Sequence, residues 1–454
     1  MAHGIVGRSD LPIPEWLFGW AAAVVLVVSF VALAVLWPQP RLQDGGLRAL
    51  PGALSAVLTS RAVEVVCGAV GVGLLFLVVY SGLRGVQVAS ANFASNFVFV
   101  VFWVGLVPAS VLLGDVFRAF NPWRALGRTV AWISQTAARE PMPAPLAYPQ
   151  RLGYLPAAAG LLAFTALELV ASSGSQPKNV AVATLAYSAI TFVAMALYGV
   201  EEWSRKGEAF GVYFSLFARI SVWTRRGERL GLRKPLSGLA EFEPLPGSVL
   251  LLAVMIGTVT FDGAGEGPLW TGAAPRIQDL FESIGLSPEK ALEGAFFIGL
   301  CAGVALIFGF YRLGMTGAAS VGGNQSVKRL TRAFVHTLVP IATAYVMAHY
   351  LTFLLYQGQS MKFLVSNPLG GNATNIFGTA DDAIDYGVIG ATTAWYCQVG
   401  FVVVGHVAAL TMAHDRALVT YDKARLAVRS QYWMLLVMIG FTLLALWLLA
   451  QSNG

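Results

Sequence analysis

The stretch AFVHTLVPIATAYVMAHYLTFLLY, residues 333–356, is almost entirely apolar yet carries two histidines, His336 and His349. A transmembrane helix needs about 20 mainly apolar residues, so this stretch is long enough to cross a bilayer. The apolar run 386–412 repeats the pattern with His406, and His414 follows just after it. Ionisable side chains at such depth are costly and mark a functional site by default. We therefore expect the function to centre on residues 328–416.

The composition of the whole chain agrees with a membrane protein. Of its 454 residues, 56% are hydrophobic and 12% are charged, and the mean hydropathy is +0.66. Soluble domains carry about 25% charged residues. The sequence therefore predicts an all-α, polytopic bundle that forms one domain over residues 1–454.

Ten apolar runs have the length of membrane spans, with boundaries soft by several residues. They lie near residues 15–37, 61–83, 94–115, 152–172, 179–200, 247–262, 291–312, 333–356, 386–412 and 431–450.

The basic residues predict the orientation of these runs. Alternate loops, beginning with the one after the first run, contain 3, 5, 8, 4 and 4 Lys and Arg, whereas the N-terminus and the remaining loops contain 1, 1, 1, 2 and 1. These sums, 24 against 6, account for all 30 basic residues. Because basic residues concentrate in cytoplasmic loops, we expect both termini outside.

Two of the basic segments interleave aromatic residues with Arg and Lys, over residues 115–133 and 211–234. This pattern is typical of amphipathic helices in the headgroup plane, so we expect membrane lipid as a partner on the cytoplasmic side. The net charge of +6 follows from the same loops, and we do not expect nucleic acid to bind. The cysteines Cys67, Cys301 and Cys397 lie in apolar runs without zinc spacing.

The predicted orientation divides the histidines by depth. His336 and His406 fall in the inner third, His414 reaches the cytoplasmic boundary, and His349 lies near the outer surface. Imidazole and carboxylate groups together bind zinc, iron, manganese or copper and activate water as a nucleophile. The residues that we expect to supply ligands to such a divalent metal ion are His349, Asp262, Asp385, Asp381, Glu168 and His3.

Other functional hypotheses use the same residues. The intramembrane polar side chains His336, His406, Tyr350 and Gln357 also suit a transporter that relays protons or cations. Paired histidines bind haem, but the 8-residue spacing of His406 and His414 does not match the 13-residue spacing of His336 and His349, which weighs against haem.

Structural roles account for several of these residues. A buried histidine often bonds only a carbonyl or a carboxylate. His414, Asp415 and Arg416 then anchor a helix end in the headgroups, and Asp385 caps a helix.

Three segments carry a resemblance to a known family: HYLTFLLYQGQ (349–359), SNPLGGNATNIFGTADDAIDYGVI (366–389) and AWYCQVGFVVVGHVAALTMAHDRAL (394–418). Together with HGIVGRSDLPIPEWLF (3–18) they resemble a bacterial integral-membrane family commonly labelled fenitrothion hydrolase. The resemblance implies a multi-pass protein of the plasma membrane that hydrolyses an aryl phosphotriester, a small apolar substrate. It supplies no catalytic residue. Because an N-out first span with so short a tail is unusual, a further hypothesis is that a cleaved signal precedes this sequence and leaves Ala2 or His3 near the mature end.

Overall fold

The computed structural model describes residues 15–43, 45–137, 145–227, 229–371 and 374–452. Most of the described residues are helical, and each of the ten predicted runs corresponds to a helix or to consecutive helices. They correspond to α1 (Glu15–Leu36), α3 (Arg61–Arg84), α4–η2–α5 (Phe93–Asn96, Phe97–Gly105, Leu106–Leu113), α8 (Leu155–Leu169), α9 (Pro177–Tyr198), α13 (Ser248–Gly265), α15 (Pro288–Ser320), α16–η3–α17 (Val327–Phe334, Val335–Thr337, Leu338–His349), α20 (Ala391–Thr420) and α21 (Ala424–Ser452).

Short elements connect these helices. They are α2 (Gly52–Leu58), η1 (Ala89–Ala91), α6 (Val116–Phe120), α7 (Pro122–Ala137), α10 (Val200–Lys206), α11 (Ala209–Ala218), α12 (Ser237–Ala240), α14 (Pro268–Ser283), α18 (Leu351–Gln357), η4 (Gly358–Ser360) and α19 (Met361–Ser366). A small antiparallel sheet has the order β1 (Arg48–Ala49), β3 (Arg229–Leu232), β2 (Trp223–Arg226).

The prediction of an all-α polytopic bundle is confirmed. Within the described part of the chain, nine helical segments are long and apolar enough to cross a membrane. The remaining run, the fourth (152–172), forms α8, an apolar helix of 15 residues, which spans only about 22 Å at 1.5 Å per residue. Helix α15, at 33 residues, extends well beyond its predicted run.

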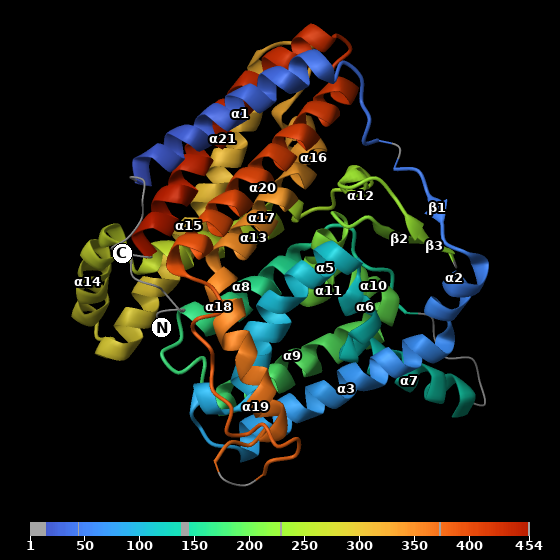
Figure 1. Ribbon diagram of the computed structural model, residues 1–454, viewed down its shortest axis with the longest axis vertical. Coiled ribbons are helices and arrows are strands. Elements are labelled where there is room, and N and C mark those ends of the chain that lie inside the picture. Colours follow the sequence, from blue (N-terminus) through green and yellow to red (C-terminus); the bar gives the residue numbers. More distant parts are fainter. Residues whose placement is uncertain (1–14, 44, 138–144, 228, 372–373, 453–454) are drawn as a thin grey trace.

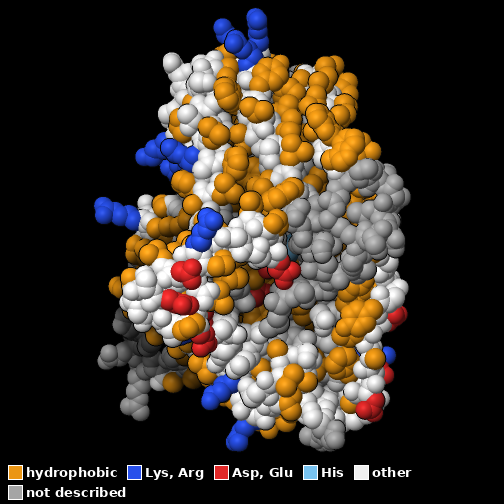
Figure 2. All heavy atoms as spheres, turned by 90° about the vertical axis from the view of Figure 1, so that its left-hand side faces the viewer, with side chains coloured by type: hydrophobic (Ala, Val, Ile, Leu, Met, Phe, Trp, Pro, Cys, Tyr) orange, Lys and Arg blue, Asp and Glu red, His pale blue; other side chains and the backbone are white. Residues whose placement is uncertain are grey.

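The ends of the helices separate into two sides (Figure 1). Helix α1 begins and α21 ends on the side that carries α14 and the connection between α19 and α20. The small sheet and α7 lie on the opposite side. Figure 2 looks onto the first side, where Asp and Glu side chains gather at mid-height. This arrangement matches the predicted alternation of loops; that the first side faces outward remains a prediction.

The run 333–356 does not form one continuous helix. Pro340 has no N–H for the carbonyl of His336, and its ring crowds that carbonyl. The backbone accordingly tightens into the 3₁₀ turn η3 at Val335–Thr337. A second interruption lies at Tyr350, which separates α17 from α18 with φ −97° and ψ 12°.

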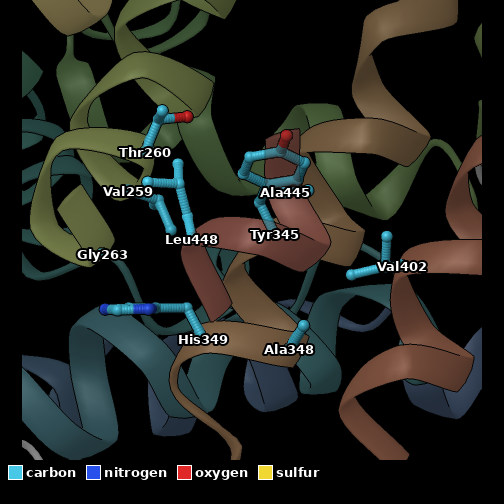
Figure 3. Close-up of a pocket in the computed structure, with 9 residues that line it drawn as sticks. All are labelled: Val259, Thr260, Gly263, Tyr345, Ala348, His349, Val402, Ala445 and Leu448. Atoms are coloured by element: carbon cyan, nitrogen blue, oxygen red, sulfur yellow. The ribbon is translucent and has the colours of Figure 1, made fainter. Parts of the chain in front are cut away.

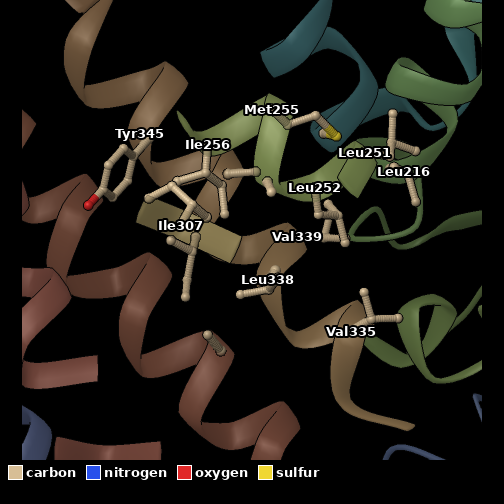
Figure 4. Packing of buried hydrophobic residues seen from close by; sticks show 14 of the residues in the cluster. Leu216, Leu251, Leu252, Met255, Ile256, Ile307, Val335, Leu338, Val339 and Tyr345 are labelled. Carbon is tan, nitrogen blue, oxygen red and sulfur yellow. The ribbon is translucent and has the colours of Figure 1, made fainter. Parts of the chain in front are cut away.

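Helices α13 and α17 lie at the centre of the bundle, as their apolar residues on all faces require. Every residue of α13 from Leu251 to Phe261 is buried, and most of α17 is buried too. Leu252 and Ile256 of α13 pack with Val339 of α17 and neighbouring side chains in the close-packed core that Figure 4 shows. The run 333–356, which contains α17, thus lies inside the bundle rather than against lipid.

The two segments expected to lie in the headgroup plane fold differently from each other. Helix α7 keeps an exposed apolar face with Val130, Trp132 and Ile133, as an interfacial helix needs. The prediction for 211–234 does not hold: α11 lies in the core with its aromatic side chains buried, and the basic residues follow in the hairpin of β2 and β3. Residues 209–218 contain no Arg or Lys, and α11 packs against α5 and α8.

An ion-pair network joins α3, α7 and α10 on the side of the sheet. The guanidinium of Arg124 donates from Nη1 to Glu64 at 2.8 Å and from Nε to Glu201 at 3.0 Å. Burial opposes the charge of Arg124, but the hydrogen bonds and charges of the two glutamates outweigh it and raise the pKa of the guanidinium. The network fixes the amphipathic helix α7 against two neighbours.

Asp415 is not a headgroup anchor. Its side chain is fully buried and holds the segment after α1. Oδ1 accepts hydrogen bonds from Trp37 Nε1 at 3.1 Å and from the main-chain nitrogens of Arg41 at 2.5 Å and Leu42 at 3.2 Å. Oδ2 accepts one from Gln43 Nε2 at 2.6 Å. The carboxylate therefore ties α20 to the chain that leaves α1.

His414 supports the same connection. Its Nε2 lies 3.0 Å from the carbonyl oxygen of Trp37, and its Nδ1 lies 3.0 Å from Gln431 Oε1 on α21. Gln431 Nε2 donates to the carbonyl of Ala427, which turns Oε1 toward the histidine. Both ring nitrogens of His414 thus have oxygen partners, and the residue joins α20, α21 and the end of α1.

Candidate functional site

Asp262, near the end of α13, receives two side chains from the junction of α17 and α18. Its Oδ2 lies 2.9 Å from His349 Nε2 and accepts a hydrogen bond of 2.7 Å from the Tyr350 hydroxyl. The side chains of His349 and Asp262 are only 16% and 11% exposed, so solvent screens their interaction little. Two consecutive residues thus converge on one carboxylate oxygen.

The helix break makes this convergence possible. Consecutive residues of a regular α-helix point about 100° apart, so in an unbroken helix His349 and Tyr350 would not face the same partner. Since α17 ends at His349 and Tyr350 forms the junction to α18, both side chains reach Asp262. Their rings meet edge to face with centroids 4.7 Å apart.

A second carboxylate adjoins this group. Glu168 comes from the last turn of α8 and lies close enough to Asp262 for the two carboxylates to repel each other. Its Oε2 atom is shut off from solvent and has no hydrogen-bond partner among the described residues. Tyr350 and the fully buried Tyr213 of α11 also interact electrostatically with Glu168. We call Glu168, Asp262, His349 and Tyr350 the outer cluster.

A small cavity adjoins the outer cluster on the side of His349 (Figure 3). It encloses about 30 Å³, which is room for one or two water molecules. Its lining comes from α13, α17, α20 and α21 and consists of Val259, Thr260, Gly263, Tyr345, Ala348, His349, Val402, Ala445 and Leu448.

Gly263 leaves the ring of His349 accessible from this cavity. A Cβ atom at Gly263 would lie 3.6 Å from both Nδ1 and Cε1 of His349, so a side chain there would occupy the space beside Nδ1. When Nε2 donates to an ionised Asp262, Nδ1 carries no hydrogen and is a proton acceptor. The geometry therefore presents a basic nitrogen to a space that fits water.

The expected metal ligands do not assemble into one centre in the described part of the chain. There, no group of three or more His, Cys, Asp or Glu side chains is placed to hold a metal ion. The structure brings together His349, Asp262 and Glu168, of which the first two bond each other. His3 lies outside the described residues, and a metal ion at this site remains a prediction.

The two other predicted ligands lie in the segment between α19 and α20. Asp381 is exposed. Asp385 is exposed as well and bonds within its own loop, where its Oδ1 accepts from the main-chain nitrogen of Gly387 at 2.7 Å. Gln359 Oε1 accepts from the main-chain nitrogen of Asp385 at 3.0 Å, so Asp385 shapes the loop before α20 rather than capping that helix.

The remaining polar residues lie apart from Asp262. His336 and His406 are buried in η3 and α20, and each has an Nε2 atom without a partner among the described residues. The ring of His406 lies 6.3 Å from that of Tyr345, whereas His336 interacts electrostatically with Arg416. Gln357 is half-buried at the end of α18.

Sequence reasoning had named Tyr350 only as a polar residue of its span and did not connect it with Asp262. It also missed Tyr213, which lies in the segment predicted to be interfacial. The sequence feature that could have identified Tyr350 is its position directly after His349. No pattern in the sequence pointed to Tyr213.

The chain matches no protein-family model, no curated protein and no solved structure. The function is therefore argued from the geometry of the site.

Proposed function

We propose that this protein moves protons within the membrane at the outer cluster, as part of a proton-coupled transporter. The observation that carries the proposal is the meeting of Asp262 with His349 and Tyr350 beside the unpartnered Oε2 of Glu168. Ionisable groups inside a bundle of spans are the usual components of proton relays.

The chemistry of the outer cluster suits reversible binding of a proton. Two carboxylates that repel each other in a low-dielectric site are costly when both are charged, so protonation of either Glu168 or Asp262 stabilises the pair. His349 adds a group that takes up and releases a proton near neutral pH. Tyr350 donates to Asp262 and holds the carboxylate in place during either state.

The size of the cavity also favours this proposal over chemistry on an organic substrate. Pockets for drug-sized molecules enclose about 300–1,000 Å³, roughly ten to thirty times the 30 Å³ beside His349. Water and protons fit this space without rearrangement of the bundle.

The test is proton movement in purified proteoliposomes. Vesicles with a pH-sensitive dye inside receive a potassium gradient and valinomycin, which draws protons inward. We expect the wild-type protein to acidify the interior faster than protein-free vesicles do, at least about tenfold, as positioned proton-transfer groups typically achieve. Equal rates in both kinds of vesicle would contradict the proposal.

A second candidate function is hydrolysis of an apolar ester, as the resemblance to the fenitrothion hydrolase family implies. The supporting observation is that His349 presents Nδ1 to a cavity that fits water while Asp262 bonds Nε2, an arrangement typical of a general base. Release of nitrophenol from an aryl phosphotriester by the wild type, and its loss in His349→Gln, would favour this candidate. An equal rate in both proteins would exclude His349 as its base.

A further inference from the structure

Two of the histidines on α20 differ in how their ring nitrogens are used. His414 has oxygen partners at both nitrogens. His406, two turns earlier and 0% exposed, has one. Its Nδ1 lies 2.7 Å from the carbonyl oxygen of Val402, while its buried Nε2 has no partner among the described residues.

The hydrogen bond to Val402 fixes the tautomer of His406. A carbonyl oxygen only accepts, so Nδ1 carries the hydrogen and Nε2 of the neutral ring is left as an acceptor. Leaving a buried acceptor unpaired costs about 1–3 kcal/mol, and most buried polar atoms in proteins avoid it. His414, by contrast, has an oxygen partner within 3.0 Å of each ring nitrogen.

His406 lies directly behind the cavity of the outer cluster. Tyr345 lines that cavity together with His349, and the ring of Tyr345 also lies 6.3 Å from the ring of His406. Val402, whose carbonyl holds His406, lines the same cavity. Tyr345 and Val402 thus lie between the water-sized space beside His349 and the ring of His406.

The helices around this connection are tightly packed. A Cβ atom at Gly405 would lie 2.3 Å from Ala344 Cβ and 2.8 Å from the carbonyl oxygen of Pro340, so α17 and α20 touch there without room for water. Between α17 and α20 a proton therefore moves through side chains rather than through a column of water.

We propose that His406 is the second proton-binding group of the relay, after the outer cluster, and that it receives the proton of the outer cluster by way of Tyr345. This inference rests on the proposed function. Once the outer cluster has protonated His349 at Nδ1, this N–H bond breaks as the cavity water takes the proton. The Tyr345 hydroxyl takes a proton from that water as its own O–H bond breaks, and the released proton forms an N–H bond at His406 Nε2. His406 becomes an imidazolium that keeps its bond to Val402, and release of the same proton restores the neutral ring.

The charged and titratable groups around this step are few. Tyr345 faces His406 from α17, and His349 with Asp262 lies beyond the cavity. Toward the other side of the bundle lies His336, whose Nε2 also has no partner among the described residues. Its ring interacts electrostatically with Arg416. The positive charge of Arg416 disfavours a second positive charge on a nearby histidine. This repulsion favours onward release of the proton.

The first test measures proton flux in the proteoliposomes described above. We expect His406→Gln to lower the flux at least about tenfold, because the amide cannot take up a proton. Thr411→Val is the matched control, since the Thr411 hydroxyl bonds only the carbonyl of Val407 on the same helix, at 2.8 Å; its flux should equal that of the wild type. Wild-type flux in His406→Gln would overturn the inference while leaving the proposed function standing.

The second test needs no variant of His406 and so does not depend on its folding. Gly405–His406 is the one Gly-His pair in the chain, so carbonyl-labelled glycine with ¹⁵N-labelled histidine identifies His406 by solid-state NMR. We expect its Nε2 signal to move to the protonated position when the outside is acidified. A signal that stays neutral at every pH would overturn the inference and indicate a nitrogen satisfied by trapped water. Absence of flux in the wild type would instead remove the proposed function.

Discussion

Replacement of Asp262 by asparagine is expected to lower proton flux in proteoliposomes by at least about tenfold. Asparagine has the size of aspartate, so the packing of α13 is kept, but its amide holds no exchangeable carboxyl proton. The variant also replaces the anion that His349 and Tyr350 bond at 2.9 and 2.7 Å. The substitution therefore removes both the exchangeable proton and the carboxylate that orients the imidazole of His349.

Two comparisons separate this effect from general damage. Asp381→Asn changes an exposed aspartate between α19 and α20 and should keep wild-type flux. Tyr350→Phe removes one hydrogen bond to Asp262 and should lower the flux by only about two- to tenfold, since such a bond contributes about 0.5–1.5 kcal/mol. Asp262→Asn with the flux of Asp381→Asn would show that the carboxylate plays no part.

The largest effect on stability is expected from Asp415→Ala. The variant removes the acceptor of four hydrogen bonds, which come from Trp37, Gln43 and the main chain of Arg41 and Leu42. Hydrogen bonds to a charged group contribute about 1.5–3 kcal/mol each, and the donors left behind are partly or fully buried, so we expect a loss of at least about 3 kcal/mol. Thermal unfolding in detergent, followed by tryptophan fluorescence, measures the change.

The matched control for this variant is Asp381→Ala, which removes an exposed carboxylate and should leave the unfolding temperature unchanged. Loss of the Asp415 contacts should also free the segment after α1, so proteolysis near residues 37–43 should become faster. An unchanged unfolding temperature for Asp415→Ala would mean that the buried carboxylate does not hold α1 and α20 together.

The arrangement of helices was predictable because two strong signals act together. Long apolar runs have to be helical in lipid, since each backbone polar group needs a partner within its own segment. The break at η3 was also readable from Pro340. The burial of α11 was not, because its aromatic residues suit a membrane surface and a core equally well, and only packing against α8 and α5 decides between them.

The candidate site was predictable only in part. His349 and Asp262 were named because both lie at the same end of their spans, and depth along a span follows from the sequence. The contact of Tyr350 with Asp262 depends on the angle between α17 and α18, which no local pattern gives. Asp381 and Asp385 share the expected side of the membrane with the cluster, but sharing a side does not bring two residues into contact.

The most direct test of the account is infrared spectroscopy of the protein in lipid at neutral pH. If Glu168 and Asp262 hold a proton between them, the spectrum contains the carbonyl stretch of a protonated carboxylic acid, and this band disappears in Glu168→Gln. Glu293→Gln, which changes a carboxylate of α15 that is paired with Lys290, should keep the band. A wild-type spectrum without the band, or the same band in Glu168→Gln, would contradict the claim that the outer cluster is a proton site.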